Sequence, residues 1–165
     1  MKNIARYALA VAVAAVCAAH VLADGSSESE WADYEYERLY VDAQAAVLFP
    51  QGGARARRQG GGVARAGYYV GDFLAVEAAA SCMEEGAGFS LRGLWHWWGY
   101  EKFDPFFTFG AAWWTEGVAG PTAGWGCFWH FDDNWSLRFD ADAMVDVGPD
   151  SGVAFAVSIG VQYAF

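Results

Sequence analysis

Charged residues are scarce in this chain of 165 residues, and lysine is almost absent. Beyond the N-terminal segment the only lysine is Lys102. Soluble β-proteins commonly use lysine to protect the exposed edges of their sheets. Hydrophobic residues make up 55% of the chain, and this excess argues against an ordinary water-soluble surface. The formal net charge of −10 gives no electrostatic basis for binding nucleic acid.

Long apolar runs are missing after the first two dozen residues, which excludes a transmembrane helix there. The one such run, residues 7–22, follows the basic residues Lys2 and Arg6. It leads into Val21-Leu22-Ala23, which has small residues at the positions that a signal peptidase reads. This order predicts a cleaved secretory signal over residues 1–23. A membrane anchor is the alternative, but the run is shorter than the twenty or so residues that a spanning helix needs. Cleavage removes two bases and no acid, so the charge of −10 becomes −12.

Cysteine is also rare, and only Cys82 and Cys127 follow the predicted signal. Two cysteines exclude a small scaffold held together by several disulfides. They fall on segments that we expect to be the third and sixth strands. Because those strands are not neighbours, we expect no disulfide between them.

The rest of the chain predicts an all-β fold. Residues 24–38 are acidic and polar, and we interpret them as a flexible leader. From residue 39 to residue 165 the sequence divides into eight segments of about ten residues, separated by turn signals. The predicted strands are 39–49, 63–70, 73–82, 88–98, 106–114, 122–131, 135–145 and 153–165.

Side chains alternate in character along these segments. In the last one, bulky apolar residues such as Val153 and Phe155 occupy one face, and small or polar residues such as Ala154 and Ser158 occupy the other. The seventh segment repeats the pattern, with Phe139 on the apolar face and Arg138 on the polar face. Strands of alternating polarity that close into a barrel leave no unpaired edge in lipid. We therefore predict an eight-stranded antiparallel up-and-down transmembrane β-barrel.

Alternation alone leaves the direction of the two faces open. A soluble periplasmic β-barrel that binds a ligand would turn its bulky residues inward, whereas a membrane barrel turns them toward lipid. The abundance of tryptophan on the apolar faces, and the clustering of aromatic residues near strand ends, favour the membrane barrel, since outer-membrane barrels carry aromatic girdles at both interfaces. The predicted location is the outer membrane of a Gram-negative-type envelope.

Three stretches carry a resemblance to a known family. The end of the chain, with Tyr163 two residues before the terminal Phe165, resembles the closing strand of outer-membrane barrels. Residues 124–138 and 68–77 resemble the sixth-to-seventh and second-to-third hairpins of the OmpA-like family of small outer-membrane barrels. The resemblance implies that Tyr163 and Phe165 form the signal read by the barrel-assembly machinery, and that the N-terminus is periplasmic. The resemblance covers residues 39–165, which correspond to the barrel domain of the family. The larger members of the family carry a peptidoglycan-binding domain after that barrel.

Charged residues on the polar faces predict an ionic interior. Eight-stranded barrels have an interior just wide enough to be filled by side chains. Because unpaired buried charges are costly, we expect these residues to form a salt-bridged network. A gated ion path or small pore is the functional alternative. The predicted network consists of Asp42, Arg65, Glu77, Arg92, Arg138, Asp140 and Asp142.

A local basic cluster, Arg55, Arg57 and Arg58, lies in the first predicted outer loop. Arginine pairs bidentately with phosphate oxygens, so the cluster predicts contacts with lipopolysaccharide. A solvated loop without a ligand is the alternative interpretation.

No catalytic, metal or cofactor site is predicted. His96 and His130 lack the HxH and HExxH spacings of metal sites, and we expect both to be hydrogen-bonded filler residues. A lipid-A-modifying enzyme, the catalytic alternative, would need a histidine and a serine close together at the outer rim. The predicted function is therefore structural: an outer-membrane barrel that helps to maintain the envelope.

Overall fold

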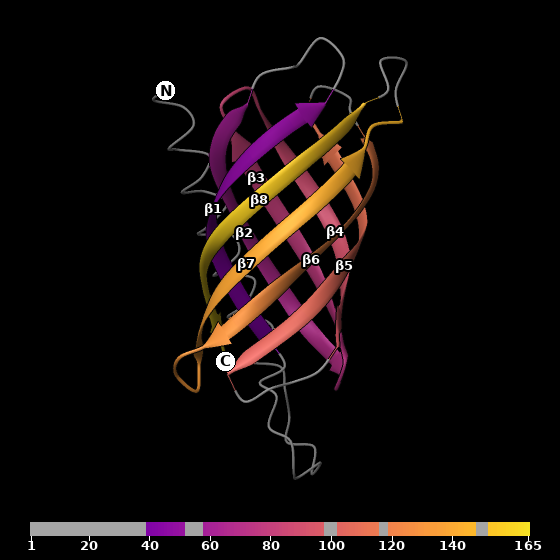
Figure 1. The fold of residues 1–165 in the computed structure, drawn as a ribbon. Coiled ribbons are helices and arrows are strands. Elements are labelled where there is room, and N and C mark those ends of the chain that lie inside the picture. The colour runs from indigo at the N-terminus through magenta and orange to yellow at the C-terminus, as the bar shows by residue number, and fades with distance from the viewer. Residues whose placement is uncertain (1–38, 52–57, 98–101, 116–118, 148–151) are drawn as a thin grey trace.

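A closed barrel of eight antiparallel strands makes up the structure, a computed structural model that describes residues 39–51, 58–97, 102–115, 119–147 and 152–165. Each strand pairs with the next in sequence, and the last pairs with the first (Figure 1). The strands are β1 (Leu39–Gln51), β2 (Gln59–Gly71), β3 (Leu74–Met83), β4 (Gly86–His96), β5 (Phe103–Trp114), β6 (Ala119–His130), β7 (Trp135–Val145) and β8 (Val153–Ala164).

The predicted fold class is confirmed, but several strands extend beyond the predicted bounds. Strand β2 begins at Gln59 rather than at residue 63, because Gly60 pairs with Val47 of β1 and Gly61 pairs with Met83 of β3. Glycines in this run indicate a loop in isolation, yet strands on both sides supply hydrogen-bond partners. Strands β5 and β6 likewise begin three residues before their predicted starts, and each includes a proline.

Two features of the N-terminal part lie outside the described residues: the predicted signal (1–23) and the predicted leader (24–38). In the part of the chain that the structure describes, no helix is long and apolar enough to cross a bilayer.

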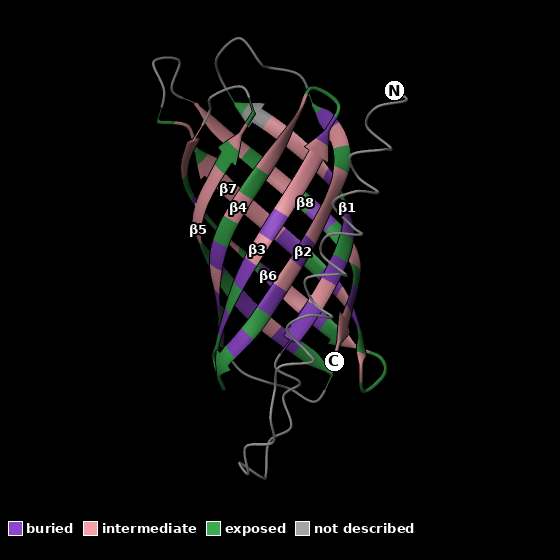
Figure 2. Cartoon of the chain, turned by 180° about the vertical axis from the view of Figure 1, so that it is seen from behind, coloured by how far each residue is buried: buried purple, intermediate pink, exposed green. Residues whose placement is uncertain are grey.

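The outer surface of the barrel is apolar, and its interior is polar at mid-height. Buried and exposed residues alternate along most strands (Figure 2). Trp125 is 62% exposed and Trp95 is 59% exposed, whereas Arg138 is fully buried. A water-soluble barrel requires the opposite arrangement, with bulky residues inside. The alternative of a soluble, ligand-binding barrel is therefore wrong, and the exterior is suited to hydrocarbon.

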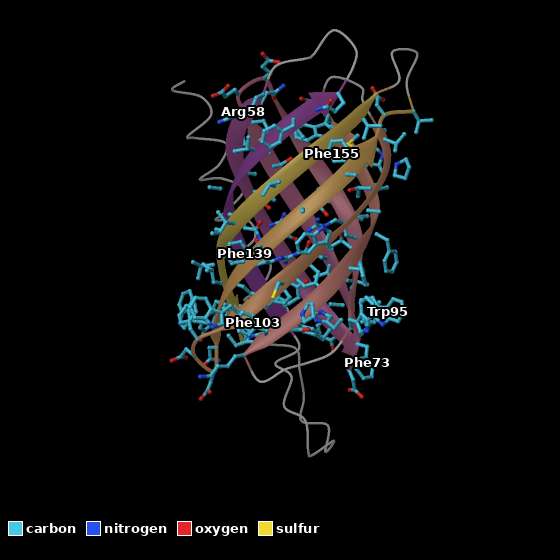
Figure 3. The ribbon with its side chains drawn as sticks, in the orientation of Figure 1. Arg58, Phe73, Trp95, Phe103, Phe139 and Phe155 are labelled. Carbon is cyan, nitrogen blue, oxygen red and sulfur yellow. The ribbon has the colours of Figure 1, made fainter. Side chains whose placement is uncertain are left out.

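Aromatic side chains gather near the C-terminal end of the barrel, by which we mean the end that carries Phe165 and the β2–β3, β4–β5 and β6–β7 connections. Phe73, Trp95 and Phe103 project outward there (Figure 3). The rings of Phe103 and Trp129 stack with centroids 6.2 Å apart, and those of Trp135 and Tyr163 lie 4.9 Å apart. Amphipathic rings in such positions match the girdle that anchors a barrel at the membrane–water interface.

Phe139 projects outward at about mid-height (Figure 3) and tests the orientation of the wall. We expect Phe139→Arg to lower the free energy of unfolding by about 2–4 kcal/mol, because a cation would face the middle of the bilayer. Denaturant unfolding in lipid vesicles measures this change. Asp133→Arg, in the exposed β6–β7 turn, is the control and should change stability little. Equal effects of the two substitutions would contradict a lipid-facing wall.

Candidate functional site

Inward-facing side chains form three layers along the barrel axis, and each layer holds side chains of one kind from several strands. On β1, Tyr40 lies nearest the C-terminal end, Asp42 and Gln44 lie at mid-height, and Ala46 lies beyond them. On β6 the inward series changes from Phe128 to glycines. The barrel therefore holds an aromatic layer, an ionic layer and a layer of small residues.

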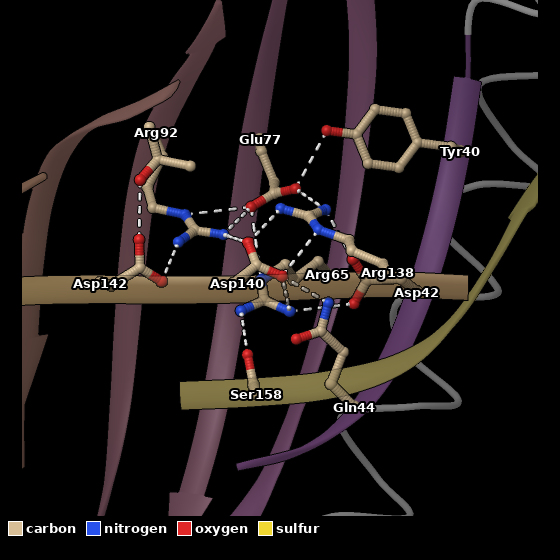
Figure 4. Close-up of polar contacts among 11 residues, drawn as sticks. Tyr40, Asp42, Gln44, Arg65, Glu77, Arg92, Arg138, Asp140, Asp142 and Ser158 are labelled. Atoms are coloured by element: carbon tan, nitrogen blue, oxygen red, sulfur yellow. Dashed lines mark hydrogen bonds and ion pairs between the residues drawn. The ribbon is translucent and has the colours of Figure 1, made fainter. Parts of the chain in front are cut away.

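Arg138 of β7 is the centre of the ionic layer and is fully buried (Figure 4). Its Nε and Nη2 groups donate to the two carboxylate oxygens of Asp140 at 2.9 and 2.8 Å. Its Nη1 group donates to Asp42 at 2.7 Å and to Glu77 at 2.5 Å. One guanidinium thus joins carboxylates from β1, β3 and β7, and each contact is a strong charge-assisted hydrogen bond.

Arg92 and Arg65 complete the ionic layer. Arg92 donates to Glu77 at 2.5 Å and to Asp142 at 2.6 Å. Arg65 is held less closely, since its shortest contact with a carboxylate is 3.3 Å, to Asp42. All seven residues of the predicted network therefore meet in the structure, with four carboxylates against three guanidiniums.

Neutral side chains complete the hydrogen bonding of the carboxylates. Tyr40 donates from its hydroxyl to Glu77 at 3.0 Å, Gln44 donates to Asp140 at 2.8 Å, and Thr108 donates to Asp142 at 2.7 Å. None of these three residues belongs to the network predicted from the sequence. Tyr40 lies two residues before Asp42 and therefore shares its inward face, which is the sequence signal that could have identified it.

The aromatic layer seals the barrel on the C-terminal side of the network. The rings of Phe106 and Phe128 lie 4.7 Å apart, and the guanidinium of Arg138 lies 5.0 and 5.1 Å from their centroids. Glycine is required beside these rings: a Cβ at Gly67 would meet the ring of Tyr40, and one at Gly126 would meet Phe106. The rings occupy the space that side chains at those two positions would need.

The two histidines lie at the C-terminal end and form hydrogen bonds. Nδ1 of His96 lies 2.6 Å from a carboxylate oxygen of Asp104, and Nδ1 of His130 lies 2.6 Å from the hydroxyl of Ser136. The structure thus brings a histidine and a serine together, but at the end that the OmpA-like resemblance places in the periplasm. Within the described ranges, no three His, Cys, Asp or Glu residues are arranged to hold a metal ion.

The remaining predicted residues lie near the ends of the barrel. Arg58 is exposed, with its guanidinium 5.7 Å from the centroid of Phe49, whereas Arg55 and Arg57 lie outside the described residues. Tyr163 and Phe165 lie at the C-terminal end, with ring centroids 5.0 Å apart. The cysteines Cys82 and Cys127 are free and lie on β3 and β6.

Comparison with solved structures finds small membrane barrels. Neisserial surface protein A shares 13% identity, with a TM-score of 0.64, over 77% of this chain and 97% of its own. A de novo designed transmembrane β-barrel shares 17% identity, with a TM-score of 0.61, over 81% of this chain and 99% of its own. The Escherichia coli outer membrane protein W shares 14% identity, with a TM-score of 0.54, over 81% of this chain and all of its own.

The chain has the fold of a small transmembrane β-barrel. At these identities the likeness extends to the fold and no further. No family model matches the sequence, and no curated protein matches it.

Removing the central guanidinium tests the network. We expect Arg138→Met to lower the free energy of unfolding by about 3–5 kcal/mol, because it leaves buried carboxylates without their partner. Adding Asp140→Asn should restore part of the loss, since it removes one of those charges. Arg58→Met, at an exposed position, should stay within about 0.5 kcal/mol of the wild type. Denaturant unfolding in one detergent compares the four proteins, and a double variant no more stable than the single one would contradict this account.

Proposed function

We propose that the chain is an integral outer-membrane protein of the OmpA-like barrel class, with a structural role in maintaining the envelope. The observation that carries this proposal is the inverted distribution of polarity: a closed sheet that is apolar outside and ion-paired inside. A bilayer requires a closed sheet, because every backbone group must find its hydrogen-bond partner within the sheet. It also requires apolar side chains on the outside of the barrel.

A closed interior supports a structural role over a pore. The ionic layer joins side chains from β1, β2, β3, β4 and β7 across the lumen, and the aromatic layer lies directly beneath it. An ion would have to displace strong charge-assisted hydrogen bonds to pass. An enzymatic role has less support, since Ser136, the serine that contacts a histidine, is only 3% exposed.

The end of the barrel opposite the C-terminus is the proposed contact surface for lipopolysaccharide. By the resemblance, the C-terminal end is periplasmic, so the opposite end faces outward. Arg58 is exposed there (Figure 3), and its guanidinium lies 5.7 Å from the centroid of the Phe49 ring. An arginine beside an outward ring is placed to pair with a phosphate at the edge of the hydrocarbon. Arg55 and Arg57 precede it in the sequence and add charge to the same loop.

Neutralising this cluster tests the contact. We expect the triple variant Arg55→Gln, Arg57→Gln and Arg58→Gln to bind lipopolysaccharide about tenfold more weakly, because three exposed ion pairs together contribute roughly 1–2 kcal/mol. Binding of the refolded protein to lipopolysaccharide micelles at low and high salt measures this change. Lys102→Gln, at the C-terminal end, is the matched control and should bind like the wild type. A triple variant that binds normally would exclude the cluster as the contact.

Tyr163 and Phe165 are the proposed assembly signal. The backbone N–H of Phe165 donates to the carbonyl of Leu39 at 3.0 Å, so this residue completes the pairing of β8 with β1. The side chain of Tyr163 packs against both Trp135 and Phe165 at the girdle. An exposed aromatic strand end is available to a receptor before the barrel closes.

Replacing Phe165 separates assembly from stability. We expect Phe165→Ser to reduce the protein in the outer-membrane fraction of cells severalfold, while the purified chain still refolds in detergent, because the residue lies at the surface and outside the core. Phe155→Ser, an outward phenylalanine at the other end of β8, is the control and should assemble normally. Density-gradient fractionation measures location. Wild-type protein absent from the outer-membrane fraction would overturn the proposed location itself.

A further inference from the structure

The third interior layer is hollow. A cavity of about 90 Å³, partly open to solvent, lies between the ionic layer and the end of the barrel opposite the C-terminus. Its walls come from inward positions that carry small side chains, such as Ala46, Ala79, Ala112 and Ala156. Eight-stranded barrels of this width are usually filled by side chains or hold one small ligand. The sequence of this half supplies too little side-chain volume to fill it.

The walls of the cavity are mostly apolar. Met83 and Met144 line it from β3 and β7, and Trp114 lines it from β5, with its indole N–H 3.3 Å from the sulfur of Met144. Methionine adapts its shape to irregular apolar partners. An apolar body of small size therefore fits between these walls.

The floor of the cavity holds a guanidinium with unused hydrogen-bonding capacity. Arg65 is 3% exposed and lines the cavity, and its Nε group makes no hydrogen bond but lies 3.4 Å from a carboxylate oxygen of Glu77. Its two hydrogen bonds are long, at 3.3 Å to Asp42 and 3.4 Å to Ser158 (Figure 4). Arg92 and Arg138 both form contacts of 2.5 Å instead. Arg65 therefore forms fewer and longer hydrogen bonds than Arg92 and Arg138, and it is the guanidinium of the network most easily engaged by a further acceptor.

The charges of the network select the kind of molecule that Arg65 can accept. Four carboxylates already outnumber three guanidiniums, so a further anion would add to an excess of negative charge. Asp142 also lines the cavity, but its two oxygens already accept hydrogen bonds from Arg92 and Thr108. A cation would therefore lie against two guanidiniums, Arg65 and Arg92, with one carboxylate that is already paired. We propose that this cavity is a binding site for a small uncharged molecule that has an apolar body and one acceptor oxygen, such as a ketone or an ester, with the oxygen bound by Arg65.

The two methionines provide the measurement. The chain contains three methionines, Met1, Met83 and Met144, and two of them line the cavity. We would refold the full chain with ¹³C-labelled methionine methyl groups in detergent micelles and assign the signals with Met144→Leu. Titration with cyclopentanone should shift the Met83 and Met144 signals saturably. Methylcyclopentane, which has no oxygen, should bind about tenfold more weakly, since a hydrogen bond to a charged donor is lost. Cyclopentanecarboxylate should also bind at least tenfold more weakly, because of the excess negative charge.

A pair of matched substitutions distinguishes binding in the cavity from partition of the probe into the detergent micelle. Ala156→Leu fills the cavity from β8 and should abolish the shifts, whereas Ala141→Leu, on the outward face of β7, should leave them unchanged. A difference in gel mobility before and after boiling shows that each variant is folded. The proposal is overturned if no saturable shift occurs, if Ala156→Leu still responds, or if the hydrocarbon or the carboxylate binds as well as the ketone.

Discussion

Closure of the sheet is the constraint on which the rest of this structure depends. Once β8 pairs with β1, no strand has a free edge, and each strand residue faces either the lumen or the surroundings. A shift of register by one residue would exchange the two sides for a whole strand, turning Arg138 outward and Phe139 inward. The cost of either error in lipid is several kcal/mol, so the alternation of side chains specifies the register as well as the fold.

The ionic layer follows from that constraint. Register places Asp42 opposite Arg65 and Glu77 opposite Arg92, so two acid–base pairs are formed by neighbouring strands alone. Arg138 then joins the two pairs from the other side of the lumen. Replacing Arg138 removes several bonds at once, so the bonds of the network depend on one another. Such a network adds specificity for one register more than it adds net stability.

Sequence periodicity predicted the side on which a residue lies, but not its height in the barrel or its partner. The bulky outward series from Val153 to Phe165 and the inward charges of β7 could be identified from spacing alone. The contribution of Asp104 was missed because the predicted strand began at residue 106, after Pro105, although Asp104 shares the inward phase of Phe106. The division of the lumen into three layers was also missed, because it depends on the offset between strands, which a single-strand pattern does not contain.

The division into layers makes the two halves of the barrel different: one half is filled by packed and ion-paired side chains, and the other contains the cavity. The aromatic and ionic layers concentrate packing and charge pairing in the half that includes the C-terminus, where β8 closes against β1. The other half retains its backbone hydrogen bonds but has alanine, serine and glycine at many inward positions, and the larger Met83, Trp114 and Met144 leave a cavity between them. A chain under selection for stability alone would fill that space, since each buried methylene group is worth about 0.8 kcal/mol. Small residues that line the cavity lie on several different strands, so the cavity is a property of the whole half-barrel and not of one position. Arg65 at its floor supplies the hydrogen-bond donor that the proposed ligand needs.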